Sequence, residues 1–334
     1  YIFKTKDVVK KFMVKLLSLL NEHFPNETIL KLVITIPERE NVIVDLLKNI
    51  LAELGIRNDR LVILGHKQSY MYYAVSQPKE LWANSVGLFE FDEMGLRYTN
   101  LTVDKRTIPY IVGADVHDLS DIMPYSVLQE KGDVKYMFLN TANTMLHKKM
   151  VTTIYVTGKG FDQRWATDAL KELCNGRRVF RGQNLFNKGA AYAARMLTDR
   201  EKTKEFIFLD DDMLTSDISI RTYHNAKMHD VVLAKAGTLW SDIDESIDII
   251  PDNEDEIQIT DKNVLTRETR AHILSLSGFA VRDNKTTRFT VRIRFADQYT
   301  CIVTLKDNGF GEFYPSTNRI WERYIKINGA DSKN

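Results

Sequence analysis

The chain has 334 residues, of which 44% are hydrophobic and 27% charged, a composition typical of globular proteins with more than one core. The formal net charge of +1 excludes a strong overall attraction to nucleic acid or to an anionic membrane surface. No apolar run is long enough to span a bilayer, and no signal peptide opens the chain. The two cysteines, Cys174 and Cys301, lack the spacing of a disulfide framework or a zinc site. We therefore expect a cytoplasmic protein without a nucleic-acid or membrane partner.

Helices and buried strands alternate through the first part of the chain. The helical spacing of apolar residues after Asp7, a candidate N-cap, predicts the opening helix, and the β-branched run LVITI predicts a strand buried on both faces. Gly55 is placed to end the second helix. The expected elements are a helix at 7–22, a strand at 30–36, a helix at 40–54, a strand at 60–64 and a helix at 68–75.

A hairpin is expected next, over residues 87–103, because polar and apolar residues alternate on both sides of a turn at Glu93–Met94–Gly95. The region 104–133 is less regular. The remaining elements expected in this half are a helix at 134–149, a strand at 152–157, a glycine turn at 158–160 and two helices joined by a short loop within 162–198.

The pattern changes to short strands from residue 205. In TRFTVRIRF, residues 287–295, apolar residues face one way and Arg288, Arg292 and Arg294 the other. Asp307–Asn308–Gly309 is a hairpin signal. We predict an α/β domain over residues 1–204, an antiparallel β-sandwich-like domain over 205–328, and a tail at 329–334.

The order of these elements resembles the actin and DnaK-type heat-shock chaperone ATPase superfamily. The stretches that carry this resemblance are LVITIPE (32–38), LAELGI (51–56), RLVILGHKQSYMYYAV (60–75), LFEFDEMGLRYTNL (88–101), IYVTGKGF (154–161) and GAAYAA (189–194). The resemblance implies an actin-like ATPase (ribonuclease H-like) fold, partial or degenerate, over residues 1–204. The stretches 176–194 and 307–317 also resemble an uncharacterised bacterial family without established activity.

The resemblance implies ATP and magnesium as ligands and assigns residues to them. Asp92 and Gly95 would lie near phosphate and metal, and Thr157, Gly158, Lys159 and Gly160 near the nucleoside, because glycine turns let backbone N–H groups approach a ligand.

Two departures from the family pattern weaken the implied nucleotide site. Glu93 and Met94 replace the glycine and threonine of the family's phosphate turn, and the carboxylate of Glu93 would repel phosphate. The superfamily's first phosphate loop, expected before the opening helix, is missing from this sequence. We therefore expect weak or lost ATP binding, and we assign no catalytic residue and no metal ligand.

Each candidate also has an ordinary structural explanation. Asp92 can be an exposed turn residue, and Gly158 and Gly160 can serve a tight turn without a ligand. The run Arg177–Arg181 either meets a phosphate or pairs with acids on a solvated loop. The arginine stripe on 288–294 is best explained as a solvent face, and Asp210–Asp212 as a loop after a strand.

Three functions remain open. The first is interaction with a protein or peptide through the β domain, with the nucleotide fold as a scaffold or slow switch. The second is an ATPase or kinase whose first phosphate loop lies upstream of Tyr1. The third is a structural or assembly protein that has lost nucleotide.

Overall fold

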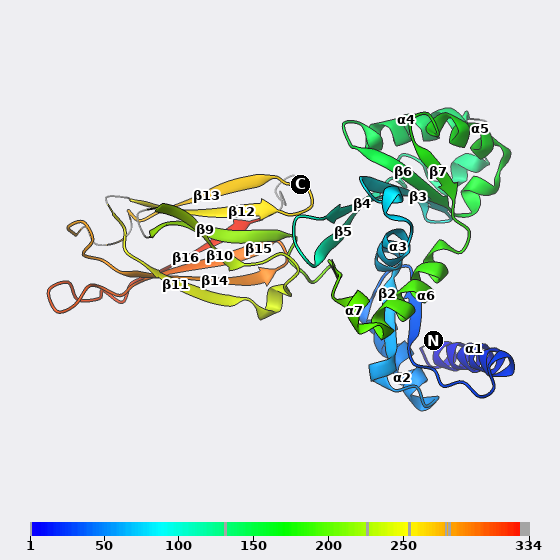
Figure 1. The fold of residues 1–334 in the computed structure, drawn as a ribbon, viewed down its shortest axis with the longest axis horizontal. Coiled ribbons are helices and arrows are strands. Elements are labelled where there is room, and N and C mark those ends of the chain that lie inside the picture. The colour runs from blue at the N-terminus through cyan, green and yellow to red at the C-terminus, as the bar shows by residue number, and fades with distance from the viewer. Residues whose placement is uncertain are drawn as a thin grey trace. The chain divides into compact units, whose positions relative to one another are not determined.

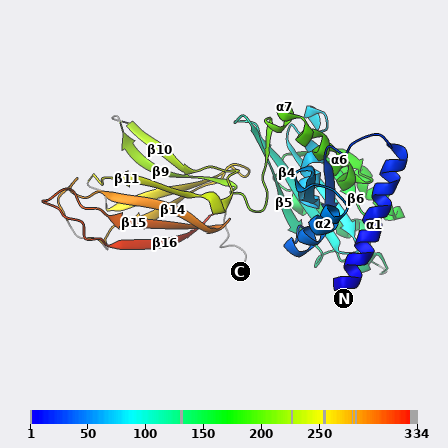
Figure 2. The ribbon, with the colours of Figure 1, turned by 90° about the horizontal axis from the view of Figure 1, so that it is seen from below.

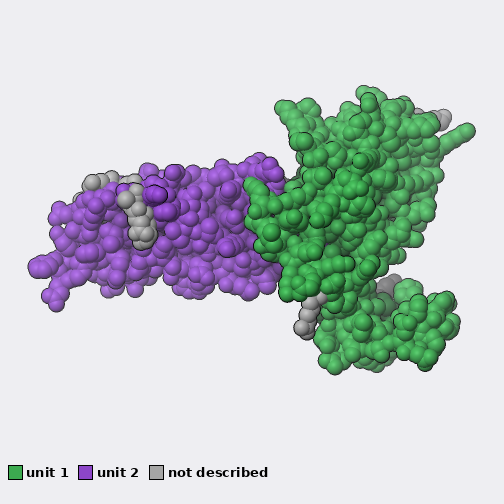
Figure 3. Space-filling model, viewed as in Figure 1, with its two compact units in different colours: residues 1–206 green, residues 207–334 purple. Residues whose placement is uncertain are grey.

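A computed structural model describes residues 2–129, 132–224, 227–252, 255–277, 279 and 282–327. The chain divides into two compact units, residues 1–206 and 207–334 (Figure 3). The sequence places this division between residues 204 and 205. The tail expected at 329–334 lies outside the described residues.

The first unit mixes helices and strands. Its helices are α1 (Ile2–His23), α2 (Asn41–Glu53), α3 (His66–Val75), α4 (Val134–Leu146), α5 (Arg164–Leu173), α6 (Leu185–Thr198) and α7 (Arg200–Thr203). Its strands are β1 (Leu32–Ile36), β2 (Leu61–Gly65), β3 (Ser85–Asp92), β4 (Gly95–Asp104), β5 (Tyr110–Asp118), β6 (Val151–Thr157), β7 (Arg178–Arg181) and β8 (Phe206–Phe208), the last of which includes the unit boundary.

A six-stranded sheet in the order β7-β6-β3-β4-β5-β8 forms the centre of this unit (Figures 1 and 2). Strands β3, β4 and β5 are antiparallel neighbours, whereas β6 and β7 run parallel to β3. Helices α4 and α5 cover one face through an aromatic cluster that includes Phe89, Phe138 and Phe161. On the other face, Tyr70 of α3 donates a hydrogen bond to the carbonyl of Val86 at 3.0 Å.

Strands β1 and β2 form a separate two-stranded parallel sheet. Apolar side chains of α2 pack against it, and α1 contributes Val9 and Met13 to the same cluster. Lys6 and Lys10 of α1 each lie 2.7 Å from a carboxylate oxygen of Glu53 in α2. These two ion pairs tie the opening helix to the helix that covers the small sheet.

The second unit consists of strands and one short 3-10 helix, Trp240–Asp242. The strands are β9 (Ser216–His224), β10 (Lys227–Ala234), β11 (Asp244–Ile249), β12 (Glu256–Asn263), β13 (Thr269–Ser275), β14 (Phe289–Asp297), β15 (Thr300–Asp307) and β16 (Ile320–Lys326). They form two four-stranded sheets, ordered β10-β9-β12-β13 and β11-β14-β15-β16, in which every pair is antiparallel.

One apolar cluster lies between these two sheets. Ile220 and Ile259 come from the first sheet, and Val291, Ile293 and Val303 from the second. The alternation predicted for residues 287–295 is confirmed, since the apolar side chains of β14 are buried and its arginines are not. Burial of this alternating set against a second sheet is what fixes the register of the strand.

A buried ion pair anchors the long connection between β15 and β16. Both carboxylate oxygens of Asp307 accept hydrogen bonds from Arg282 at 3.0 Å. The same carboxylate accepts from the Thr317 hydroxyl at 2.6 Å and from the Gly309 N–H at 2.7 Å. The tight hairpin predicted at Asp307–Gly309 is therefore wrong: β16 begins only at Ile320, because the Asp307 carboxylate organises a longer loop.

Three other predictions about local structure are wrong. The loop expected over residues 177–181 contains strand β7. The opening helix begins at Ile2, so Asp7 lies inside it and does not cap it. All five residues of β1 are half-buried and not fully buried, since β1 pairs only with β2 among the described strands.

Within the part of the chain that the structure describes, no helix combines the length and the apolar character that crossing a membrane requires.

Candidate functional site

The two turns singled out in the sequence lie side by side at one edge of the six-stranded sheet. Strand β3 pairs in parallel with β6, with Glu90 opposite Thr157, so both strands end at this edge (Figure 1). The turn between Asp92 and Gly95 follows β3, and the turn from Thr157 to Gly160 follows β6. Lys159 Nζ lies 3.3 Å from Glu93 Oε1, so an ion pair links the two turns.

The glycines of these turns pack against protein atoms. Gly158 has a φ of +102°, and a Cβ added there would lie 2.2 Å from the carbonyl oxygen of Phe91. A Cβ at Gly160 would lie 2.4 Å from the Phe91 ring, and one at Gly95 would lie 2.6 Å from Cβ of Ser120. Close packing against other parts of the chain therefore explains all three glycines. This favours tight turns without a ligand at both places.

A cluster of ionisable side chains lies on the α3 side of the same edge. Glu90 is buried on β3, directly opposite Arg97 on β4. Arg97 Nη2 lies 3.3 Å from Glu90 Oε1 and 3.8 Å from Asp92 Oδ2. His66, the first residue of α3, places Nδ1 3.4 Å from Glu90 Oε1, and its ring stacks on Phe186 of α6 with 3.7 Å between centroids.

The two acids of this cluster have opposite pKa shifts. Burial opposes ionisation of Glu90, but the polar contact with His66 and the charge of Arg97 outweigh it and hold the pKa of Glu90 below its usual value. Burial raises the pKa of Asp92, and the charge of Glu90 raises it further against the opposing hydrogen bond from the Met94 N–H. Glu90 is therefore the ionised member of the pair over a wider pH range than Asp92.

Two nitrogens of the cluster are buried and have no hydrogen-bond partner among the described residues. They are His66 Nδ1, which lies 3.4 Å from Glu90 Oε1 without the geometry of a hydrogen bond, and Arg97 Nε. Such groups are costly unless a polar atom satisfies them. The two nitrogens point to a polar partner, whereas the carboxylates of Glu90, Asp92 and Glu93 would repel a phosphate.

His66, Glu90 and Arg97 were not among the residues predicted from the sequence. The available signal was Glu90 itself, an acid on a strand between Phe89 and Phe91. A buried carboxylate needs a partner, and the residue opposite it across a hairpin is the first candidate. Pairing β3 with β4 on either side of the predicted turn would have identified Arg97.

Two other sequence candidates have acidic or backbone partners. In the arginine stripe, Arg292 pairs with Asp244, and Arg294 Nη2 lies 3.7 Å from Glu322 Oε2. Asp210 accepts a hydrogen bond from the backbone N–H of Asp211 at 2.8 Å in the turn after β8. No set of three or more His, Cys, Asp or Glu side chains in the described ranges has an arrangement that could hold a metal ion.

Comparison with known families covers both units. The model of the C-terminal part of a family of unknown function, DUF5716, matches residues 2–211, which is more than half of the chain. The chain therefore belongs to this family. Residues 213–327 match a domain of unknown function, DUF8552. No curated protein matches the chain.

Proposed function

We infer that this member of the DUF5716 family is a binding protein whose second unit takes an extended peptide segment of a partner protein. Its first unit is, in this proposal, a degenerate nucleotide fold of the actin and DnaK type with weak or lost ATP binding. In this proposal the protein has no catalytic role.

The strand order of the large sheet supports the ancestry of the first unit. Three antiparallel strands, β3, β4 and β5, are extended on the β3 side by two parallel strands, β6 and β7. This arrangement supports the ribonuclease H-like fold that the sequence resemblance implies.

Contacts at the edge of the sheet where β3 and β6 end support weak or lost ATP binding, because they fill the space that a nucleotide would need. Lys159 and Glu93 bridge the two turns, and Phe91 fills the space beside Gly158 and Gly160. The exposed carboxylate of Glu93 would repel a phosphate at this edge, and Lys159 is already paired with that carboxylate.

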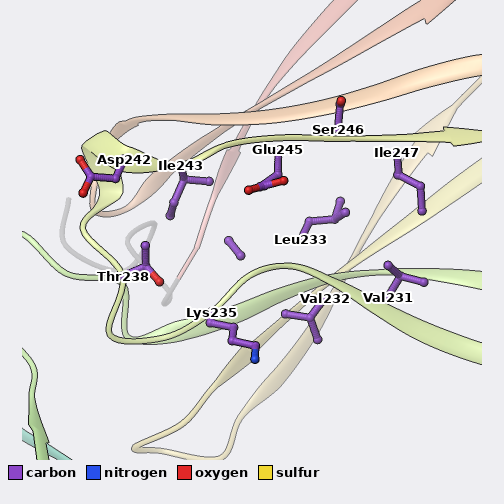
Figure 4. A pocket seen from close by; sticks show the side chains of 11 residues that line it. Val231, Val232, Leu233, Lys235, Thr238, Asp242, Ile243, Glu245, Ser246 and Ile247 are labelled. Atoms are coloured by element: carbon purple, nitrogen blue, oxygen red, sulfur yellow. The ribbon is translucent and has the colours of Figure 1, made fainter.

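A groove in the second unit is the observation that carries the proposal. A cavity of about 490 Å³ lies between β10 and β11, each of which is the last strand of its sheet. Figure 4 shows Val231 opposite Ile247 at one end and Thr238 with Asp242 at the other. No strand among the described residues pairs with the outer edge of either strand. Such edges carry unpaired backbone donors and acceptors, which an extended peptide can satisfy.

Strand β11 is the better of the two edges for pairing. All six of its residues pair with β14 in continuous register, from Asp244 to Ile249. The register of β10 shifts between Val232 and Ala234, and a bulge of this kind disrupts pairing. We therefore place the peptide as an added strand on β11.

The lining of the groove defines the chemistry of the peptide. Leu233, Ile243 and Ile247 make part of the lining apolar, whereas Asp242 and Glu245 outnumber the single Lys235 among its charged residues. A strand that alternates apolar and basic residues would place one set of side chains on the apolar lining and the other near the carboxylates.

Peptide titration of the full chain tests the proposal. The probe is a fluorescein-labelled octapeptide that alternates valine and lysine, and its control alternates valine and glutamate. We expect saturable binding of the lysine peptide, binding at least tenfold weaker for the glutamate peptide, and slower hydrogen exchange in β10 and β11 on binding.

Two charge reversals provide matched variants. Glu245→Lys at the groove should weaken binding of the lysine peptide at least tenfold, whereas Glu256→Lys, on an exposed position of β12, should leave it unchanged. Absence of binding, or equal effects of the two variants, would contradict the proposed peptide site.

One observation favours a second candidate, an ATPase completed by a phosphate loop upstream of Tyr1. The two turns that the resemblance assigns to the nucleotide, at residues 92–95 and 157–160, do follow neighbouring parallel strands. Calorimetric titration with ATP and magnesium separates the two proposals: no heat at millimolar ATP supports the first, and binding with hydrolysis supports the second.

A further inference from the structure

The arginine run after α5 opens onto a second cavity, in the first unit. This cavity of about 400 Å³ is lined by Arg177 and Arg178, the polar side chains of Asn84 and Thr152, and Glu80 and Cys174. Thr152 is near the start of β6, and Arg178 is the first residue of β7. The cavity therefore lies at the amino ends of the parallel strands, whereas the turns of the candidate site follow their carboxyl ends.

The three arginines of the run differ in their partners. Arg181 pairs with Asp162 and donates to the carbonyl of Phe161 at 2.7 Å. Arg177 and Arg178 form no ion pair with any described residue. The predicted pairing with acids is thus correct for Arg181 alone, and Arg177 and Arg178 line the cavity without forming an ion pair with a described residue.

The α5–β7 turn brings these groups together. Helix α5 ends at Leu173, Cys174 caps it, and Gly176 turns the chain with a φ of +73°. The next residue, Arg177, is half-buried, while Arg178 is exposed at the start of a strand paired with β6. The backbone that holds the arginines is therefore fixed by a helix end and a strand pair.

We propose that this cavity binds an organic phosphate monoester. Guanidinium groups present planar donors that match phosphate oxygens, and the Asn84 amide and the Thr152 hydroxyl add neutral donors. Two arginines against the single Glu80 leave the lining with a net positive charge. A volume of about 400 Å³ is within the range of small-molecule sites and exceeds what a bare phosphate ion needs.

Cys174 provides a reporter inside this cavity. Its side chain is exposed, whereas Cys301 is 1% exposed in the core of the second unit. Burial raises the pKa of the Cys301 thiol to about 12, which keeps it unreactive in the folded chain. The rate of alkylation by N-ethylmaleimide therefore reports access to Cys174.

The test measures this rate in the full chain at constant ionic strength with glycerol 3-phosphate, inorganic phosphate, ATP or sulfate. We expect 5 mM glycerol 3-phosphate to slow alkylation at least fivefold, with weaker effects of inorganic phosphate and of sulfate. Protection by ATP alone would assign the cavity to a nucleotide and overturn the proposal, as would no protection by any probe. Equal protection by all four probes means an adventitious ion only, and also overturns it.

Two variants give the control. Arg177→Ala/Arg178→Ala should abolish the protection, whereas Arg195→Ala, which removes one exposed arginine from α6, should preserve it. If the double variant fails to fold, Arg178→Ala alone, at an exposed position, should reduce the protection at least threefold. Protection that persists without these arginines would overturn the proposal. The outcome is independent of the peptide titration, which concerns the other unit.

Discussion

Replacing Asp307 with asparagine is expected to destabilise the second unit strongly. Asp307 is 1% exposed, and the side chain of its partner Arg282 is 11% exposed. The substitution leaves the guanidinium buried without its counter-charge. Removing one partner of a buried ion pair costs about 3–5 kcal/mol, a large fraction of the stability of a typical domain.

The structure supplies a matched control in the same unit. The guanidinium of Arg292 also donates two hydrogen bonds to the carboxylate of Asp244, but these side chains are 48% and 52% exposed. Exposed ion pairs contribute little to stability, because both charges remain solvated. Asp244→Asn should therefore leave the unfolding midpoint of the unit almost unchanged.

Urea unfolding, monitored by hydrogen exchange in β15 and β16, measures the stability change of each variant in the full chain. This readout does not assume that the two units unfold together. With a urea dependence of about 1–3 kcal/mol per M, the loss at Asp307 lowers the midpoint by more than about 1 M. Equal midpoints for Asp307→Asn and Asp244→Asn would refute the argument from burial.

Three further outcomes are expected. The hydrogen bond from Thr317 and the guanidinium of Arg282 outweigh the effect of burial and hold the pKa of Asp307 below its usual value. Its stabilising contribution is therefore complete above the unfolded pKa, about 3.9, and is lost as the pH falls through the folded value, so acid titration should separate the native chain from Asp307→Asn. Gly158→Ala should lower the melting temperature of the first unit more than Gly55→Ala, since both positions have positive φ but only Gly158 meets the Phe91 carbonyl. Hydrogen bonds from Lys10 and Lys6 lower the pKa of Glu53 to about 2, so any contribution of these pairs to the protection factors of α1 amides should be lost only as the pH falls toward 2. Because the pairs are exposed, Glu53→Gln should lower those protection factors only slightly at neutral pH.

Strands with one face in a core and the other in solvent could be predicted from the sequence, because every second residue along them is apolar. Strand β14 is the clearest case, with Val291 and Ile293 inside and Arg292 and Arg294 outside. Strand β7 has only four residues, two of them arginines, so its pairing with β6 is visible only in the folded sheet. Periodicity cannot detect a strand that short.

Only the backbone turns of the candidate site could be predicted from the sequence, and its cluster of ionisable side chains as a whole could not. The resemblance assigns both glycine turns to one nucleotide, and the parallel pairing of β3 with β6 does bring the turns together. The polar cluster depends on His66, Glu90 and Arg97, which come from three elements and lie together only through sheet register and helix placement. The hairpin pairing of Glu90 with Arg97 can be inferred from the sequence, whereas the approach of His66 from α3 has no local sequence signal.

The contacts that close the edge of the large sheet differ in their response to solvent. Lys159 and Glu93 are each 75% exposed, so dissolved salt screens their attraction and the pair parts readily. The packing of Phe91 against Gly158 and Gly160 involves no charge and persists at any ionic strength. Engineering an open pocket here therefore requires a smaller side chain at position 91 and a remodelled turn, and neutralising the two surface charges alone would leave the space filled.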